Sequence, residues 1–276
     1  MPAGPAATRD LVPDPDRELL CDLERGFPVS VVHATGRLSF ASAPLLRRMA
    51  HKALADQPDL LLIDVSGMEA REDLALTALP TLARHAGADG IAVIVTGPDA
   101  ALRHQLESMA ITRTVPVATS RASAVALYER LCGPPRVALP LLPDPSATAE
   151  ARRLVDDACL RWRVTDLADT AALVVTELIA NGIQHARTPL SLSLSLRERH
   201  LHVSVRDGSF LLPRRTVADD ELESGLGLLI VEGVAAAWGC VAVDDGKVVW
   251  ATLRRTGVAR RSAGPVLRRA TRPEQR

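Results

Sequence analysis

The sequence predicts two folded units: an α/β domain with a largely parallel sheet, followed by an α+β sandwich with a mixed sheet. Three observations lead to this prediction. The chain has 276 residues, more than the roughly 100–200 residues of a typical domain. Its first half alternates short apolar runs with segments of helical spacing. Its second half combines long helices with strands in which apolar and polar residues alternate.

Strands and helices alternate in the first half. Strands are predicted at 28–36, 59–67 and 91–97, and helices at 43–54, 72–87, 98–109 and 120–131. The run DLLLIDVSG at 59–67 is continuously apolar, which is typical of a strand covered on both faces. Pro80 should kink its helix or mark an early turn, whereas Pro98 and Ser120 are suited to helix starts.

A proline-rich stretch separates the halves. Residues 132–145 (CGPPRVALPLLPDP) contain five prolines, which neither continue a helix nor occupy the centre of a sheet. We therefore place a domain boundary near Gly133. The predicted parts are a flexible leader at 1–16, a first domain at 17–132, a second domain at 133–254 and a basic disordered tail at 255–276.

The second half is predicted to form two hairpins and three helices. The strands are expected at 136–142, 190–196, 201–207, 240–243 and 248–254, and the helices at 146–162, 166–186 and 225–238. The segment LSLSLSL at 190–196 alternates without a fault, so its four leucines lie on one buried face and its three serines on the other.

Charge and composition argue against some classes of function. The net charge is zero, but residues 254–276 carry +7 and the remainder carries −7, which argues against a nucleic-acid-coating protein. The aromatic content of 3% argues against stacking platforms for single strands. The basic tail is expected to be solubilising, with contact to an anionic surface as the alternative.

Targeting features are missing from the sequence. The four cysteines form no CxxC pair, and no apolar run approaches the roughly 20 residues that cross a bilayer. The N-terminus does not follow the basic-then-apolar order of an export signal. We expect a cytoplasmic protein with no membrane contact.

The predicted helix 166–186 carries a polar face. In TELIANGIQHA, Glu177, Asn181 and His185 follow one another at intervals of four, so their side chains lie about one turn apart on one side. A carboxylate and an amide placed this way can converge on one ion or one water. The alternatives are a solvated stripe and, for His185, a capping or packing role.

Two further patches follow in the chain. Asp207 ends a predicted strand, where its carboxylate can accept a hydrogen bond from an exocyclic amine. Gly225 and Gly227 open a predicted helix, where phosphate oxygens can approach backbone N–H groups. Taken alone, Asp207 is also typical of a residue that only begins a turn, and a GxG sequence before a helix is often part of a turn that binds no phosphate.

In this order, the patches resemble the GHKL ATPase superfamily, which has the Bergerat fold, and more narrowly the anti-sigma-factor serine kinases common in actinomycetes. The resemblance covers residues 136–254 and implies binding of ATP and Mg²⁺. It assigns Asn181 to the Mg²⁺, Glu177 to activation of the attacking hydroxyl and Asp207 to the adenine amino group. The second glycine box, which closes over the phosphates, corresponds to Gly225 and Gly227.

The same resemblance places a mobile ATP lid at residues 208–224. Arg214 and Arg215 lie within it, either exposed to solvent or meeting phosphate. The sequence departs from the family in the first glycine box, which usually reads D-x-G. Here it reads Asp207-Gly208-Ser209, with the glycine one place early.

The first half resembles STAS domains, the anti-sigma-factor antagonists, over residues 17–131. Asp64, Ser66 and Gly67 match the family pattern in DLLLIDVSGMEAREDLAL. Asp73 stands where the family has its phosphoacceptor serine, and an aspartate has no hydroxyl to phosphorylate. Asp73 is therefore a regulatory candidate that mimics phosphoserine permanently, or else an ordinary acidic residue at a helix N-terminus.

Together the resemblances imply a regulator of bacterial sigma-factor partner switching. It would transfer the γ-phosphoryl group of ATP to Ser or Thr of an antagonist protein, as a protein serine/threonine kinase. The expected partners are a STAS-domain antagonist, a sigma factor or both, and a second copy of the chain; no nucleic acid is expected. The alternative is a non-catalytic nucleotide-binding anti-sigma or scaffold protein with a degenerate STAS domain. A histidine-kinase-like sensor is disfavoured because no phosphoacceptor-histidine helix pair precedes the ATPase region.

Overall fold

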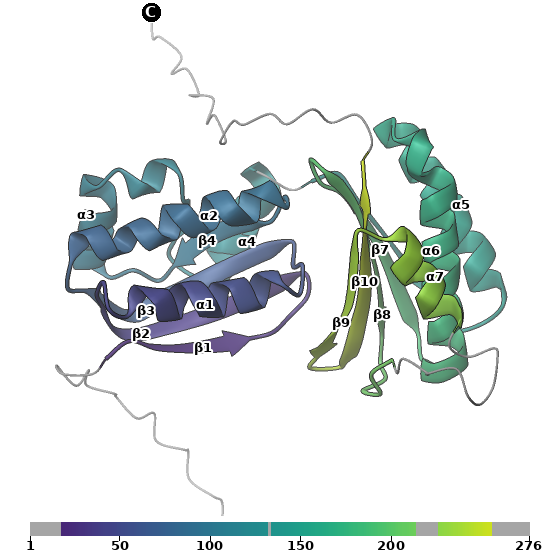
Figure 1. The fold of residues 1–276 in the computed structure, drawn as a ribbon, viewed down its shortest axis with the longest axis horizontal. Coiled ribbons are helices and arrows are strands. Elements are labelled where there is room, and N and C mark those ends of the chain that lie inside the picture. The colour runs from purple at the N-terminus through teal and green to yellow at the C-terminus, as the bar shows by residue number, and fades with distance from the viewer. Residues whose placement is uncertain (1–17, 132–133, 214–225, 256–276) are drawn as a thin grey trace, which may run out of the picture.

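The computed structural model describes residues 18–131, 134–213 and 226–255, which form two five-stranded sheets flanked by helices (Figure 1). The N-terminal sheet has the strand order β1-β2-β3-β4-β5, and the C-terminal sheet has the order β6-β7-β8-β10-β9. The predicted leader, the boundary at Gly133 and all but the first residue of the predicted tail lie outside these ranges. No described helix is both long and apolar enough to span a membrane.

The N-terminal sheet is parallel except at one edge, where β1 pairs antiparallel with β2. Its elements are β1 Leu20–Glu24, β2 Val29–Leu38, α1 Ala43–Leu54, β3 Leu60–Ala70, η1 Asp73–Thr77, α2 Ala78–Ala88, β4 Ala92–Thr96, α3 Ala100–Ser108, η2 Ile111–Arg113, β5 Val117–Ala118 and α4 Arg121–Leu131. The edge strands β1 and β5 were not predicted. Pro80 lies in the first turn of α2, where its missing N–H is tolerated.

Helices cover both faces of this sheet. One face packs against α1 and α2 through a large aliphatic core that includes Leu46, Ile63 and Leu79. On the opposite face, α4 packs over β3, β4 and β5, and beneath it Leu60, Leu62 and neighbouring residues form a smaller cluster. The long apolar run of β3 is thus buried on both sides, as its continuous pattern predicts.

The C-terminal sheet is antiparallel in every described pairing, so the mixed sheet predicted here is wrong. Its elements are β6 Arg136–Leu141, α5 Ser146–Trp162, η3 Thr165–Leu167, α6 Ala168–Asn181, η4 Gly182–Ala186, β7 Leu190–Leu196, β8 His200–Asp207, α7 Leu226–Val234, β9 Ala237–Val243 and β10 Gly246–Arg254. Short turns join β7 to β8 and β9 to β10, and the paired helices α5 and α6 return the chain from β6, so neighbouring strands run in opposite directions.

Two predicted helices of this half have different ends. The helix predicted at 166–186 becomes a π-helical turn, η4, after Asn181. The helix predicted at 225–238 ends at Val234, and Ala237 and Trp238 already belong to β9. Helices α5, α6 and α7 lie on one face of the sheet (Figure 1). The leucines of β7 point into the core beneath them, as the alternating pattern predicts.

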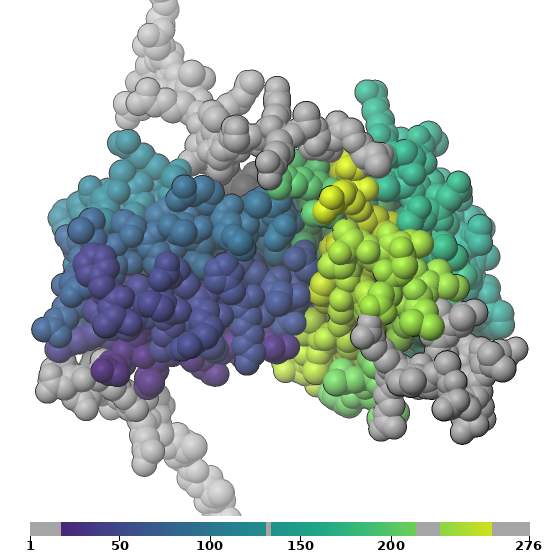
Figure 2. Space-filling model, viewed as in Figure 1, coloured from purple at the N-terminus to yellow at the C-terminus, as the bar shows by residue number. Residues whose placement is uncertain are grey.

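The other face of the C-terminal sheet is turned towards the N-terminal half, and the surfaces of the two halves meet (Figures 1 and 2). Small polar side chains on this face are buried, including Ser195 and Ser204. Phe27 of the N-terminal half stacks on His202, which in turn stacks on Trp250. Burial lowers the pKa of His202 well below its ordinary value, so the imidazole is neutral in this contact.

A buried arginine joins the halves. The Arg197 side chain is fully buried and lies 3.0 Å from the carboxylate of Asp59. It also donates to the Gln57 side chain and to the backbone carbonyls of Gln57 and Pro58. Gly90 faces the stem of this arginine, and a Cβ there would lie 2.8 Å from Cβ of Arg197. Arg136 adds a second ion pair with Asp59, at 3.1 Å.

Candidate functional site

Helix α6 brings the predicted carboxylate and amide together. Its apolar residues, among them Val175 and Leu178, are buried in the C-terminal core. Glu177 and Asn181 are half-buried. Their spacing of four residues puts both side chains on the same side of the helix. The predicted common face of these two side chains is therefore present, and their roles stay a prediction.

The start of α7 completes this arrangement. A Cβ atom built on Gly227 would lie 2.5 Å from Oε2 of Glu177 and 3.8 Å from Nδ2 of Asn181. Only a glycine lets the α7 backbone approach the carboxylate this closely without displacing it. Two neighbouring side chains of α6 and the start of α7, about 50 residues later in the chain, thus converge at one point: a carboxylate, an amide and the first turn of a helix.

The Asn181 side chain is suited to a ligand. Its Nδ2 atom is buried and has no hydrogen-bond partner among the described residues. A buried amide N–H without an acceptor is costly. A phosphate oxygen would accept a hydrogen bond from it. With the amide flipped, the carbonyl oxygen would instead face a cation. No group of three or more His, Cys, Asp or Glu side chains forms a metal site in the described ranges. Mg²⁺ commonly combines one or two protein oxygens with phosphate and water, so Asn181 fits this ion.

Asp207 lies at the end of β8 and is buried together with Lys247. The Lys247 ammonium donates to Oδ1 of Asp207 at 2.8 Å, and both side chains are less than one-tenth exposed. Strand register causes this contact, because β10 pairs with β8 so that Lys247 lies directly opposite Asp207. Lys247 was not predicted from the sequence. The available signal was its place as the last residue of the predicted turn DDGK, two strands after Asp207 along the chain.

The altered glycine box forms a compact turn. Oδ1 of Asp207 also accepts the backbone N–H of Ser209, and Lys247 donates to the carbonyl of Ser209 at 3.3 Å. The N–H of Gly208 donates to the hydroxyl of Thr188 at 2.8 Å. The Asp207 carboxylate is therefore held in a fixed orientation, with two donors on one oxygen.

The remaining predicted residues do not join this site within the described ranges. His185 lies in the π-helical turn η4 and is exposed, whereas Glu177 and Asn181 are half-buried. Gly225, Arg214 and Arg215 lie outside the described residues. So does most of the predicted lid at 208–224.

Asp73 lies in the other half of the protein. It is exposed at the first position of η1, and its Oδ1 accepts a hydrogen bond from the Gln105 side chain at 2.9 Å. The neighbouring side chains of Phe40 and Leu74 are 58% and 61% exposed. Asp73 is thus presented at the surface next to apolar side chains and apart from the α6 site.

Known families match both halves of the chain. Residues 23–124 match the family model of the STAS domain, and residues 141–270 match that of the histidine kinase-like ATPase domain. Both resemblances drawn from the sequence are confirmed at this level. No curated protein matches the chain.

Solved structures similar to the N-terminal half include antagonist proteins. An anti-sigma factor antagonist from Mycobacterium paratuberculosis is 24% identical over 43% of this chain and 99% of its own, with a TM-score of 0.38. A putative anti-sigma factor antagonist from Thermotoga maritima is 13% identical over 40% of this chain and 95% of its own, with a TM-score of 0.36.

Proposed function

We propose that this chain, a STAS domain followed by a histidine kinase-like ATPase domain, is a protein kinase of a bacterial partner-switching pathway that controls a sigma factor. It phosphorylates Ser or Thr of a separate STAS-type antagonist protein with ATP. The observation that carries this proposal is the convergence of Glu177, Asn181 and the Gly227 backbone. This arrangement supplies a proton acceptor, an ion ligand and a phosphate-facing helix start in one place.

The residues divide the chemistry between them. Glu177 accepts the proton of the attacking hydroxyl, whose oxygen forms a bond to the γ-phosphorus as the bond to the β–γ bridging oxygen breaks and ADP leaves. Asp207 accepts a hydrogen bond from the adenine amino group. Asn181 would hold Mg²⁺, which when bound neutralises charge on the phosphate oxygens. The backbone at Gly227 approaches the phosphates without a side chain in the way.

Replacing Glu177 with alanine is expected to lower the rate of phosphotransfer by on the order of 10²-fold, because the attacking hydroxyl loses its proton acceptor. The measurement incubates the full chain with labelled ATP, Mg²⁺ and candidate antagonist proteins, and counts label on the antagonist. Nucleotide binding is measured in parallel and should change little. Transfer that survives undiminished in the variant would remove Glu177 from the proposed role.

The approach of Gly227 to Glu177 can be tested within one helix. Gly227→Ala is expected to push the Glu177 carboxylate aside and lower phosphotransfer, while thermal stability holds or rises because alanine favours helices by about 1 kcal/mol. Gly233→Ala is the matched control, since a Cβ there meets nothing within 4 Å. Equal transfer by the two variants would contradict the proposed site.

A second candidate function is a nucleotide-holding anti-sigma or scaffold protein without turnover. The observation that favours it is that Lys247 and the Ser209 N–H both donate to Oδ1 of Asp207. Oδ2 is then the oxygen that remains to accept a hydrogen bond from the adenine amino group. Asp73 has no hydroxyl to phosphorylate, which is consistent with a STAS domain that cannot switch between unphosphorylated and phosphorylated states. Tight ATP binding with no transfer to any antagonist would select this candidate. Absence of nucleotide binding would reject both.

A further inference from the structure

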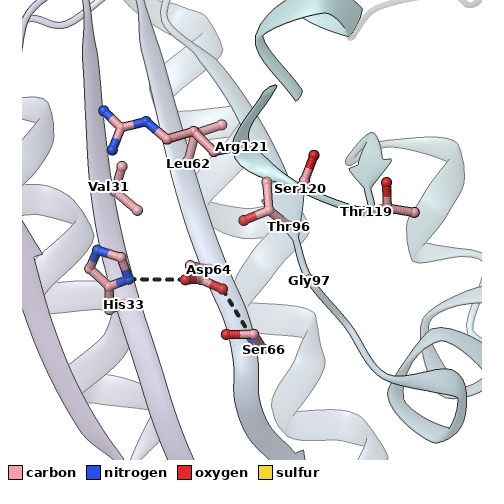
Figure 3. A pocket seen from close by; sticks show the side chains of 10 residues that line it. All are labelled: Val31, His33, Leu62, Asp64, Ser66, Thr96, Gly97, Thr119, Ser120 and Arg121. Carbon is pink, nitrogen blue, oxygen red and sulfur yellow. Dashed lines mark hydrogen bonds and ion pairs between the residues drawn. The ribbon is translucent and has the colours of Figure 1, made fainter. Parts of the chain in front are cut away.

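The STAS domain contains a cavity of about 300 Å³ that the proposed kinase chemistry does not use (Figure 3). It lies on the sheet face that α4 covers only in part, near the carboxyl ends of the parallel strands. Val31 and Leu62 contribute apolar side chains. Its volume is at the lower end of the range for small-molecule pockets, and apolar lining with a few polar groups is typical of them.

Two basic side chains lie on one side of this cavity. Arg121, at the start of α4, and His33, on β2, both line it (Figure 3). His33 Nδ1 is 3.0 Å from the Asp64 carboxylate. Burial alone would lower the pKa of His33, but hydrogen bonds to Glu24 and Asp64 outweigh burial and raise it.

A carboxylate of the protein already bridges these two basic side chains. Glu24 accepts from Arg121 at 2.6 Å through one oxygen and contacts His33 Nε2 at 3.2 Å through the other. The Glu24 side chain is 44% exposed and belongs to the edge strand β1. Exposed ion pairs of this kind typically contribute only about 0–1 kcal/mol. The position between Arg121 and His33 thus suits an anion.

The Thr96 side chain lies across the cavity from these two basic side chains. Thr96, at the end of β4, is only 4% exposed as a residue and lines the cavity (Figure 3). Gly97 follows it with φ +72°, and a Cβ there would lie 3.2 Å from Oδ1 of Asp64. The glycine keeps this end of the cavity clear. A hydroxyl on a cavity wall can donate a hydrogen bond to, or accept one from, a polar group of a ligand.

We propose that this cavity binds a small phosphomonoester, with its phosphate in place of the Glu24 carboxylate between Arg121 and His33 and a hydroxyl of its organic part against Thr96. A phosphate carries more charge than a carboxylate and accepts more hydrogen bonds, so it displaces Glu24. The organic part lies over Val31 and Leu62. Binding here would give the STAS domain a small-molecule input that is separate from nucleotide binding at α6.

The test is a titration of the full chain with glycerol 3-phosphate, followed by the amide shifts of Gly97, Thr119 and Ser120 in ¹H–¹⁵N spectra. Wild type should show saturable shifts at these residues. Glu24→Gln should tighten binding about fivefold by removing the internal competitor. Arg121→Met should weaken it at least about tenfold. Arg84→Met is the matched control, since Arg84 is exposed on α2 beyond the other face of the sheet.

Several results would overturn the proposal. One is the absence of saturable shifts in both wild type and Glu24→Gln. Another is equal weakening by Arg121→Met and Arg84→Met. Inorganic phosphate is titrated as well, and an affinity equal to that of glycerol 3-phosphate would reject the organic part of the ligand. Because glycerol 3-phosphate carries no purine, failure here leaves the proposed ATP site standing, and failure of that site leaves this proposal standing.

Discussion

Arg197→Ala is expected to separate the STAS domain from the ATPase domain, at a cost of about 3–5 kcal/mol to their association. The arginine donates to Gln57, Pro58 and Asp59, and its side chain is fully buried. Removing it leaves the backbone carbonyls of Gln57 and Pro58 without this donor inside a closed interface, and leaves the buried Asp59 carboxylate with Arg136 as its remaining ion-pair partner among the described residues. Breaking one partner of a buried ion pair in this way costs more than the intact pair contributes.

Separation should be visible in solution. Small-angle scattering is expected to give a larger radius of gyration for Arg197→Ala, and calorimetry to show two unfolding transitions at lower temperature. Arg161→Ala is the control, because Arg161 is an exposed arginine on α5 in the same domain. Scattering and unfolding that match wild type would show that the domains are not held together by this arginine.

A double substitution distinguishes the ion pair from simple loss of packing. Arg197→Met combined with Asp59→Leu removes both charges and retains apolar volume, so it should recover much of the lost association. Arg136, which also pairs with Asp59, is 36% exposed and can turn to water in the double variant. If the two domains associate as weakly in the double variant as in Arg197→Ala, packing rather than the ion pair holds the interface together.

The interface illustrates what the sequence could not predict. Alternation in LSLSLSL correctly puts the leucines of β7 into the core, but it says nothing of what covers the serines. Serine is compatible with water and with a polar interface alike. Arg197 lies in a short polar turn, where exposure is the usual expectation. Its burial depends on Asp59, which lies 138 residues earlier in the chain.

The candidate site also combines features that the sequence could predict with features that it could not. Helical spacing was sufficient to predict that Glu177 and Asn181 share a face, because that relation is local. The change to a π-helical turn after Asn181 could not be predicted from that spacing, and it leaves His185 exposed in η4. The contact of Lys247 with Asp207 depends on strand register, because a shift of one residue in β10 would turn Lys247 to the other face of the sheet. Such register is decided by packing on both strands, not by Lys247 itself.

Lys247→Met is expected to lower the free energy of unfolding of the ATPase domain by about 3–5 kcal/mol. The substitution leaves the Asp207 carboxylate buried, with the Ser209 N–H as its remaining donor among the described residues. Denaturant unfolding of the full chain is the measurement. The chain's other lysine provides the control, since Lys52 is exposed on α1 and Lys52→Met should change stability by less than about 0.5 kcal/mol.

Asp207→Asn together with Lys247→Met separates stability from nucleotide recognition. The neutral amide removes the unpaired charge, so this double variant should regain most of the stability lost in Lys247→Met. It should still fail to bind ATP tightly, because the ionised acceptor for the adenine amino group is gone. A stable double variant with wild-type ATP affinity would mean that Asp207 and Lys247 hold the sheet together and do not contact the base. A double variant no more stable than Lys247→Met would show that burial of charge is not the source of the loss.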